Sequence, residues 1–223
     1  MRTRWFSIGL ALSMALLSGC VTNVSKLNVD PHHGFTAPAA PSSGAQTAYL
    51  ADVSDGRVFV DKTSHPYDPT PALASEEERA QRIGRKRDGY GKAWGGYCLE
   101  DGQTVQDVVR VILEDALAES GYNVLHDAKA VKRDTLRLDG VVTKFWMWID
   151  NPFWPNLITD MAVRLKPADG APFDVQIQSR KFCPLLMDSF ARKSINNGII
   201  MFRSAAAEQF RNQMDSRGPR KTR

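Results

Sequence analysis

The sequence predicts an α+β fold with two layers, a mostly antiparallel sheet and helices packed on one face. Apolar residues recur every three or four positions over residues 104–120, as in an amphipathic helix. They alternate with polar residues in three consecutive segments between residues 136 and 177, as in an antiparallel meander. A second helical pattern closes the chain, so this order of elements suits one sheet covered on one face.

The first part of the predicted domain holds a strand, a short helix and a glycine-rich segment. A strand is expected over residues 47–60, with a turn or bulge at Asp55-Gly56. Ser75, followed by three glutamates, predicts the capped first turn of a short helix. Glycines are dense over residues 84–96, which indicates a loop or an irregular strand.

The second part holds the clearest elements. Thr104 and Asp107 fit a capping box at the start of the first long helix, and Gly121 ends it. A short strand is expected at residues 122–125. Three longer strands follow at residues 136–149, 157–165 and 173–177, and a final helix covers about residues 188–213. Asn197-Gly198 is expected to loosen the middle of this helix.

The remaining segments are predicted not to fold. Residues 20–46 are rich in proline and glycine, so they are expected to form a flexible tether spanning about 25–30 Å. Residues 47–214 then form a single domain, and residues 215–223 a basic, disordered tail. The formal charge is +4, and Arg2 and Arg4 lie in the segment before Cys20, so the remaining chain is near +2 and gives no reason to expect nucleic-acid binding.

An address signal precedes these segments. Residues 1–19 combine two early arginines with a short apolar run, which is typical of a secretory signal peptide. Leu17-Ser18-Gly19-Cys20 resembles the lipobox of bacterial lipoproteins. The resemblance implies cleavage before Cys20, acylation of Cys20 with chains such as palmitate, and attachment of the mature protein to a membrane by lipid. The alternative is an ordinary signal peptide with an incidental cysteine.

The residue after Cys20 bears on which membrane holds the protein. Val21, and not aspartate, stands there. By resemblance to enterobacterial sorting, this favours the periplasmic face of the outer membrane. The sorting rule varies between bacteria, so the inner membrane stays open as the alternative.

Two further cysteines, Cys98 and Cys183, are expected to pair in an oxidising compartment. The bridge would close a loop of about 85 residues. The alternative is two separate buried thiols.

A basic, glycine-rich segment is the first candidate binding site. Its members Arg85, Lys86, Arg87 and Lys92 are candidates for an anion-binding loop that would take a lipid headgroup, a glycan or an acidic protein face. The alternative is a solvated charged loop whose glycines serve tight backbone geometry.

A tryptophan-rich strand end is the second candidate. Trp146, Trp148, Phe153 and Trp154 are candidates for a partner surface. Both faces of this strand end are apolar, so one of them must be covered by a second helix, a partner or lipid. The alternative is that these aromatic residues belong to the core.

Catalytic and metal-binding patterns are not found in the sequence. It contains no G-x-S-x-G elbow, no H-E-x-x-H motif and no Walker loop, and none of its four histidines has a ligand-spaced partner. We therefore expect no metal, no cofactor and no enzymatic activity. A periplasmic enzyme acting on glycan or lipid would need Asp139, Asp150 or Asp160 to converge in a cleft.

Short motifs suggest a family. They are Ile83-Gly84, the helix end Ala116-Leu117 before Gly121-Tyr122, and Leu138-Asp139-Gly140 before an apolar strand. Together they resemble the YajG-like group of uncharacterised bacterial lipoproteins, over roughly residues 48–212. The resemblance implies a small periplasmic domain on an acylated N-terminus, with no catalytic residues.

From this we predict a membrane-anchored periplasmic lipoprotein that binds an envelope protein, a lipid or a glycan, or assists envelope assembly. A narrower alternative is an accessory lipoprotein of a lipid or lipopolysaccharide transport system, since a helix that ends in Gly-Tyr before a strand also occurs in such proteins.

Overall fold

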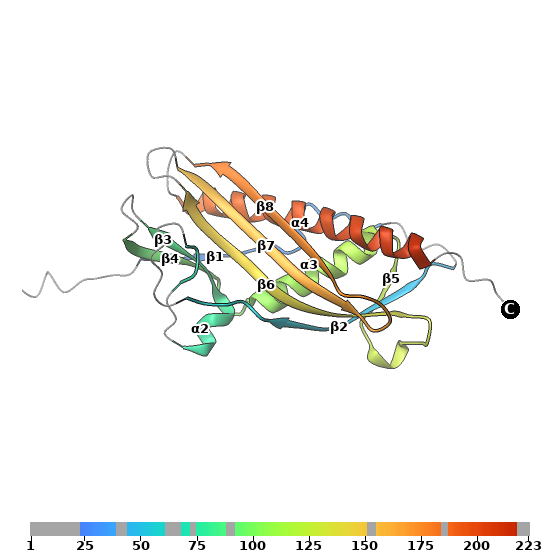
Figure 1. Ribbon diagram of the computed structural model, residues 1–223. Helices are drawn as coiled ribbons and strands as arrows, with labels where there is room; N and C mark the ends of the chain where they lie inside the picture. The colour runs from blue at the N-terminus through green and yellow to red at the C-terminus, as the bar shows by residue number, and fades with distance from the viewer. Residues whose placement is uncertain are drawn as a thin grey trace, which may run out of the picture.

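The computed structural model describes residues 23–38, 44–60, 68–71, 75–87, 92–150, 155–183 and 187–217 (Figure 1). Within these ranges eight strands form two mixed sheets, and three α-helices accompany them. The predicted α+β class is confirmed. The strands are β1 (Asn23–Leu27), β2 (Thr47–Asp55), β3 (Arg82–Arg87), β4 (Ala93–Leu99), β5 (Asn123–Leu125), β6 (Leu136–Asp150), β7 (Asn156–Pro167) and β8 (Phe173–Phe182). The helices are α2 (Glu76–Gln81), α3 (Val105–Glu119) and α4 (Asp188–Arg217), with a 3-10 turn at Ala128–Ala130.

The larger sheet has the strand order β5-β2-β6-β7-β8, and α3 and α4 pack along it (Figure 1). Strands β6, β7 and β8 form the predicted antiparallel meander. Strand β2 pairs in parallel with both β5 and β6. Parallel neighbours need a long crossover connection, and here that connection contains α2, α3 and part of a second sheet. This second sheet, of order β1-β4-β3, was not expected from the sequence.

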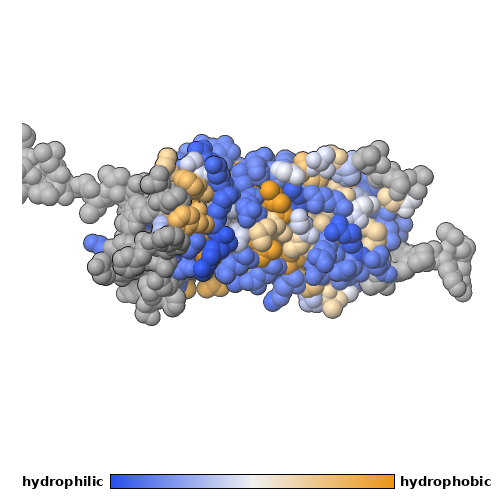
Figure 2. Space-filling model, turned by 90° about the horizontal axis from the view of Figure 1, so that it is seen from above, coloured by the Kyte–Doolittle hydropathy of each residue, from blue (hydrophilic) through white to orange (hydrophobic). Residues whose placement is uncertain are grey.

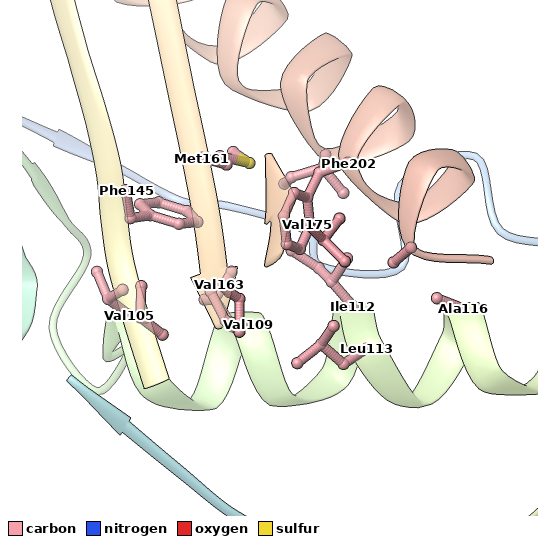
Figure 3. Close-up of a cluster of buried hydrophobic side chains, with 14 of the residues drawn as sticks. Val105, Val109, Ile112, Leu113, Ala116, Phe145, Met161, Val163, Val175 and Phe202 are labelled. Carbon is pink, nitrogen blue, oxygen red and sulfur yellow. The ribbon is translucent and has the colours of Figure 1, made fainter. Parts of the chain in front are cut away.

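The core lies between α3, α4 and the larger sheet. The cap and the end of α3 follow the prediction: the Thr104 side chain accepts a hydrogen bond from the Asp107 amide, and Gly121 has a positive φ of 93°. Figure 3 shows the apolar side of α3 facing residues of the sheet and of α4. The labelled side chains are Val105, Val109, Ile112, Leu113 and Ala116 of α3, Phe145, Met161, Val163 and Val175 of the strands, and Phe202 of α4.

Helix α4 is longer and more regular than predicted. It continues to Arg217, so residues 215–217, predicted as tail, are helical, and the rest of that tail lies outside the described residues. Gly198 does not loosen the helix. A Cβ added there would lie 2.7 Å from Cγ2 of Thr159, so this glycine lets α4 pack closely on β7.

A β-bulge in β6 changes which residues of this strand face the core. Val142 pairs with Val163 but Lys144 pairs with Ala162, so Thr143 is an extra residue. The core-facing positions are therefore even-numbered before the bulge and odd-numbered after it. They are Leu136, Leu138 and Val142 before it, and Phe145, Met147 and Ile149 after it. One core face changes parity within the strand.

Residues 23–35 pack against the domain, so the predicted flexible tether is wrong for this stretch. β1 pairs in parallel with β4. Leu27 and Val29 belong to the hydrophobic core and are 0% and 1% exposed. The long-range partners of these two side chains offset the entropy of ordering the segment, although its composition is typical of a linker.

Polar contacts hold the chain beyond β1 to both long helices. His32 Nδ1 lies 2.9 Å from Oδ2 of Asp115 on α3. Arg203 of α4 donates one hydrogen bond to the carbonyl oxygen of His33 at 2.9 Å and another to Oε1 of Glu119 at 2.7 Å. The N-terminal segment therefore ties α3 and α4 together.

Candidate functional site

The basic, glycine-rich segment forms the antiparallel pair β3 and β4 instead of an exposed loop. Arg85 and Lys86 are only 8% and 4% exposed, so the predicted anion-binding loop is wrong for these two residues. Gly84 accounts for their burial. A Cβ at Gly84 would lie 1.8 Å from the carbonyl oxygen of Met147 in β6, so β3 approaches β6 more closely than any side chain would allow.

The charged amine of Lys86 binds side chains inside the fold. Its Nζ donates to Oγ of Ser25 in β1 at 2.5 Å, and Ser25 Oγ donates to Oδ1 of Asp188 at the start of α4, also at 2.5 Å. Nζ also lies 4.8 Å from the ring centroid of Tyr97. Burial lowers the pKa of Lys86, and Asp188 opposes that shift. Burial also raises the pKa of Tyr97. This network joins β1, β3, β4 and α4.

Trp146 is covered by the chain itself, so the predicted partner surface is wrong for this residue. It is 5% exposed and lies on the face of β6 turned away from the helices. The guanidinium carbon of Arg57 lies 4.8 Å from its ring centroid, and the ring of Phe59 meets it edge-on at 5.1 Å. A segment that follows β2 thus supplies the cover that the sequence left open.

Arg57 completes this cover and has no exposed surface. Its Nε and Nη2 donate to the Asp55 carboxylate at 2.9 and 2.7 Å. Its two terminal nitrogens also donate to the carbonyl oxygens of Arg82 and Arg79, each at 2.7 Å. Burial lowers the pKa of Arg57, and the hydrogen bonds to Asp55 oppose this shift.

The rest of the predicted aromatic surface is only partly described. Trp148 is half-buried, whereas Phe153 and Trp154 lie outside the described residues. The side chain of Arg87, from the predicted basic loop, also lies outside them, and Lys92 is exposed.

Cys98 and Cys183 are both buried thiols with no disulfide between them, so the predicted bridge is wrong. Cys98 donates to the carbonyl oxygen of Ser25, at 3.8 Å from sulfur to oxygen, and burial raises its pKa. Cys183 instead acts on the neighbouring Tyr97, whose pKa it helps to raise.

The three carboxylates considered for an enzyme do not converge. Asp139 and Asp150 are eleven positions apart on β6, or about 35 Å along the strand. Asp150 accepts a hydrogen bond from Arg180 at 2.5 Å, and Asp160 accepts one from Lys144 at 3.0 Å. Among the residues that the structure describes, no group of three histidine, cysteine or acidic side chains could hold a metal ion.

What stays accessible of both candidate sites gathers at one end of the molecule, which we call the β1 end (Figure 1). Here β1 and β4 begin side by side, β6 leads to β7, β8 ends and α4 begins. The β1 end is defined by the described residues at these element ends, Asn23, Lys92, Asn156, Phe182 and Met187. Ser25 of β1 touches Asp188, and Phe182 pairs with Asn156, which places these ends together.

Two large apolar side chains are exposed at the β1 end. Phe182 is 45% exposed and Met187 is 53% exposed. Figure 2 shows hydrophobic side chains at this end of the molecule, beside the residues drawn in grey, and a further group near the middle of the same face. The sequence analysis missed both residues, because β8 was expected to end at residue 177 and neither residue belongs to a motif.

The lipobox and Cys20 lie outside the described residues. None of the described helices combines the length and the apolar composition that crossing a membrane requires. The described residues begin at Asn23, three positions after Cys20.

No protein-family model matches the sequence, and no curated protein matches it either. Two solved structures are similar to the fold. One is described as an uncharacterized protein; it is 10% identical, with a TM-score of 0.46, over 78% of this chain and 95% of that one. The other is protein XCC0632 from Xanthomonas campestris, assigned to family model DUF330; it is 10% identical, with a TM-score of 0.47, over 82% of this chain and 97% of that one.

Proposed function

We propose that this protein is a lipid-anchored lipoprotein of the bacterial envelope that binds an envelope partner and has no enzymatic activity. Its folded part would lie on the periplasmic face of the outer membrane. The observation that carries the proposal is the lipobox-like Leu17-Ser18-Gly19-Cys20 standing three positions before the first strand. An acylated Cys20 would then be the start of the folded domain.

The buried polar groups support a binding role over a catalytic one. Arg57 is engaged by Asp55 and by backbone carbonyl groups, and Lys86 is engaged by Ser25. These contacts join elements that are distant in sequence, as structural groups do. Asp139, Asp150 and Asp160, the carboxylates named as examples for the enzyme alternative, are separated along the sheet, which supports the binding role.

The narrower resemblances belong to the same proposal. We propose membership of a YajG-like group of lipoproteins, on the motifs described above, and a role as an accessory of a lipid or lipopolysaccharide transport system as the more specific version. A transport component that is crosslinked to the protein in cells would distinguish this version from a general role in envelope assembly.

The anchor is tested by growing cells with an alkyne analogue of palmitate and comparing the wild type with Cys20→Ser. We expect label on the wild-type protein, which sediments with the outer membrane, and neither property in the variant. An unlabelled wild-type protein recovered in the soluble periplasmic fraction would overturn the anchor.

The partner is tested by crosslinking in the same cells, followed by mass spectrometry of the purified protein. Trp148→Ala, at the half-buried end of β6, is the surface variant, and its folding is checked by circular dichroism. An envelope protein captured with the wild type and lost with Trp148→Ala supports the binding role. Failure of the wild type to capture any envelope protein reproducibly would overturn it.

A further inference from the structure

We propose that the β1 end lies directly on the lipid bilayer, with Phe182 and Met187 placed among the lipid headgroups. This inference rests on the proposed acylation of Cys20. It adds an orientation for the domain, an apolar contact with the membrane and the residues that make it.

The segment between Cys20 and β1 is short, which limits the distance between β1 and the bilayer. Three peptide units separate Cys20 from Asn23, and an extended chain covers at most about 3.3–3.6 Å per residue. Asn23, the first residue of β1, therefore lies within about 10 Å of an acylated cysteine at the bilayer surface. The tether expected from the sequence would have allowed a distance two to three times larger.

The position of β1 carries the second step. Asn23 pairs with Gly95 near the start of β4, and Ser25, two residues further, touches Asp188 at the start of α4. A bilayer within about 10 Å of Asn23 must therefore also be close to the other element ends gathered here. Phe182 and Met187 are among them.

The chemistry of this end suits a bilayer surface. An aromatic ring and a flexible thioether are exposed together, 45% and 53% respectively. Exposed basic side chains belong to the elements that begin or end here: β8, the first turns of α4 and the residue before β4. They are Lys92, Arg180, Arg192 and Lys193. Exposed apolar side chains together with basic ones suit the hydrocarbon boundary and the anionic headgroups of a membrane.

Two acidic side chains described at the β1 end are held by partners within the fold, and one of these partners is Arg180 itself. The Asp150 carboxylate accepts a hydrogen bond from Arg180, and that of Asp188 accepts one from Ser25 beside Lys86. Each carboxylate therefore has a partner within the fold.

Helix α4 offers a matched control for the apolar contact. Met201 is 41% exposed, close to the values for Phe182 and Met187. It lies fourteen residues beyond Met187, or about 21 Å further along the helix axis. Interfacial side chains reach only about 5–10 Å into the headgroup and acyl boundary, so Met201 should stay in water.

The test uses the full-length protein purified from membranes and reconstituted in vesicles of phosphatidylethanolamine and phosphatidylglycerol. Single variants Phe182→Cys, Met187→Cys and Met201→Cys are labelled with an environment-sensitive fluorophore. The native thiols Cys98 and Cys183 are buried, and the unsubstituted protein gives the background labelling. Lipids brominated near the headgroup then report which label touches the bilayer.

We expect quenching several-fold larger at positions 182 and 187 than at position 201, with a blue shift at the first two. Equal quenching at all three positions, or stronger quenching at position 201, would overturn the orientation. The mass of the N-terminal peptide and flotation with the vesicles are measured on the same samples. An acylated, floating protein without quenching at 182 and 187 overturns this inference alone, whereas a protein without acyl chains overturns the proposed anchor as well.

Discussion

Replacing Arg57 should be among the most destabilising single changes in this protein. Its guanidinium has no exposed surface and makes a two-pronged contact with the Asp55 carboxylate. Arg57→Ala would leave that carboxylate, whose side chain is only 8% exposed, without its cation. Breaking a buried ion pair in this way costs about 3–5 kcal/mol. That is a large part of the 5–15 kcal/mol by which domains are usually stable.

The loss in the free energy of unfolding is measured by urea titration and by thermal unfolding. Circular dichroism and tryptophan fluorescence detect the transition in both. For a domain of this size, about 3–5 kcal/mol corresponds to a decrease in Tm of about 6–20 °C. Arg57→Lys should lie between the wild type and Arg57→Ala, because a single ammonium keeps the charge but cannot form the same fork of hydrogen bonds. Arg164→Ala is the matched control. Arg164 also contacts an aspartate at 2.9 Å, but both side chains are exposed, so its loss should leave stability nearly unchanged.

A double-mutant cycle separates the ion pair from the other contacts of Arg57. Once Asp55 has been replaced by alanine, the second change strands no carboxylate, so the double variant should lose less than the sum of the two single losses. The expected difference is about 0.5–3 kcal/mol. Strictly additive losses, or an Arg57→Ala loss below about 1 kcal/mol, would refute the view that this buried pair organises the face of the sheet around it.

Four further predictions concern packing, protonation and redox state. Gly84→Ala should cost about 1–3 kcal/mol or more, because the new Cβ meets a backbone oxygen, whereas Gly140→Ala, whose nearest contact is a side chain at 3.5 Å, should be neutral or stabilising; urea unfolding of both compares them. Leu27→Ala should cost about 2–5 kcal/mol of stability. A cost below about 0.5 kcal/mol, as for a surface residue, would support the flexible tether predicted from the sequence. Burial raises the pKa of Glu114 in the folded protein. The stabilising contribution of this carboxyl is therefore complete below its ordinary pKa of about 4.3 and is lost as the pH rises through its pKa in the folded state. The stability of the wild type relative to Glu114→Gln should fall between pH 4 and pH 7. The two buried thiols should react with Ellman's reagent only after unfolding, and a reductant should not change the unfolding midpoint, whereas a reductant-sensitive midpoint would indicate a bridge.

Elements with local signals could be predicted from the sequence. Helix α3 has its cap, its apolar stripe and its terminal glycine within 18 residues. The strands of the meander alternate regularly, and their order follows the chain. The bulge at Thr143 could not be predicted, because an extra residue is recognised only from its pairing with β7. The cover over the other face could not be predicted either, because Arg57 and Phe59, which pack on Trp146, stand almost ninety residues earlier in the chain.

The candidate sites were harder to predict because their burial depends on distant residues. Lys86 lies in a segment rich in arginine and glycine, which is typical of an exposed loop. Its actual partners, Ser25 and Asp188, are 61 and 102 positions away. Arg57 carried no signal at all, since one arginine after a strand is ordinary until Trp146 lies beneath it. Sequence patterns report charge and periodicity, whereas these sites depend on long-range contacts.

The contacts of the N-terminal segment have a consequence for the order of folding. β1 pairs with β4 about seventy residues later, and His33 accepts a hydrogen bond from Arg203, 170 positions away. A chain that is made or exported from its N-terminus must therefore hold β1 unpaired until β4 is available, and must wait for the contacts of this segment with α4 until nearly all of its residues are available. A nascent chain that lacks α4 could complete neither the Lys86 network nor the contact between His33 and Arg203. We expect such intermediates to be cleaved by proteases within residues 23–38, and protection of that segment to appear only when the last helix has packed.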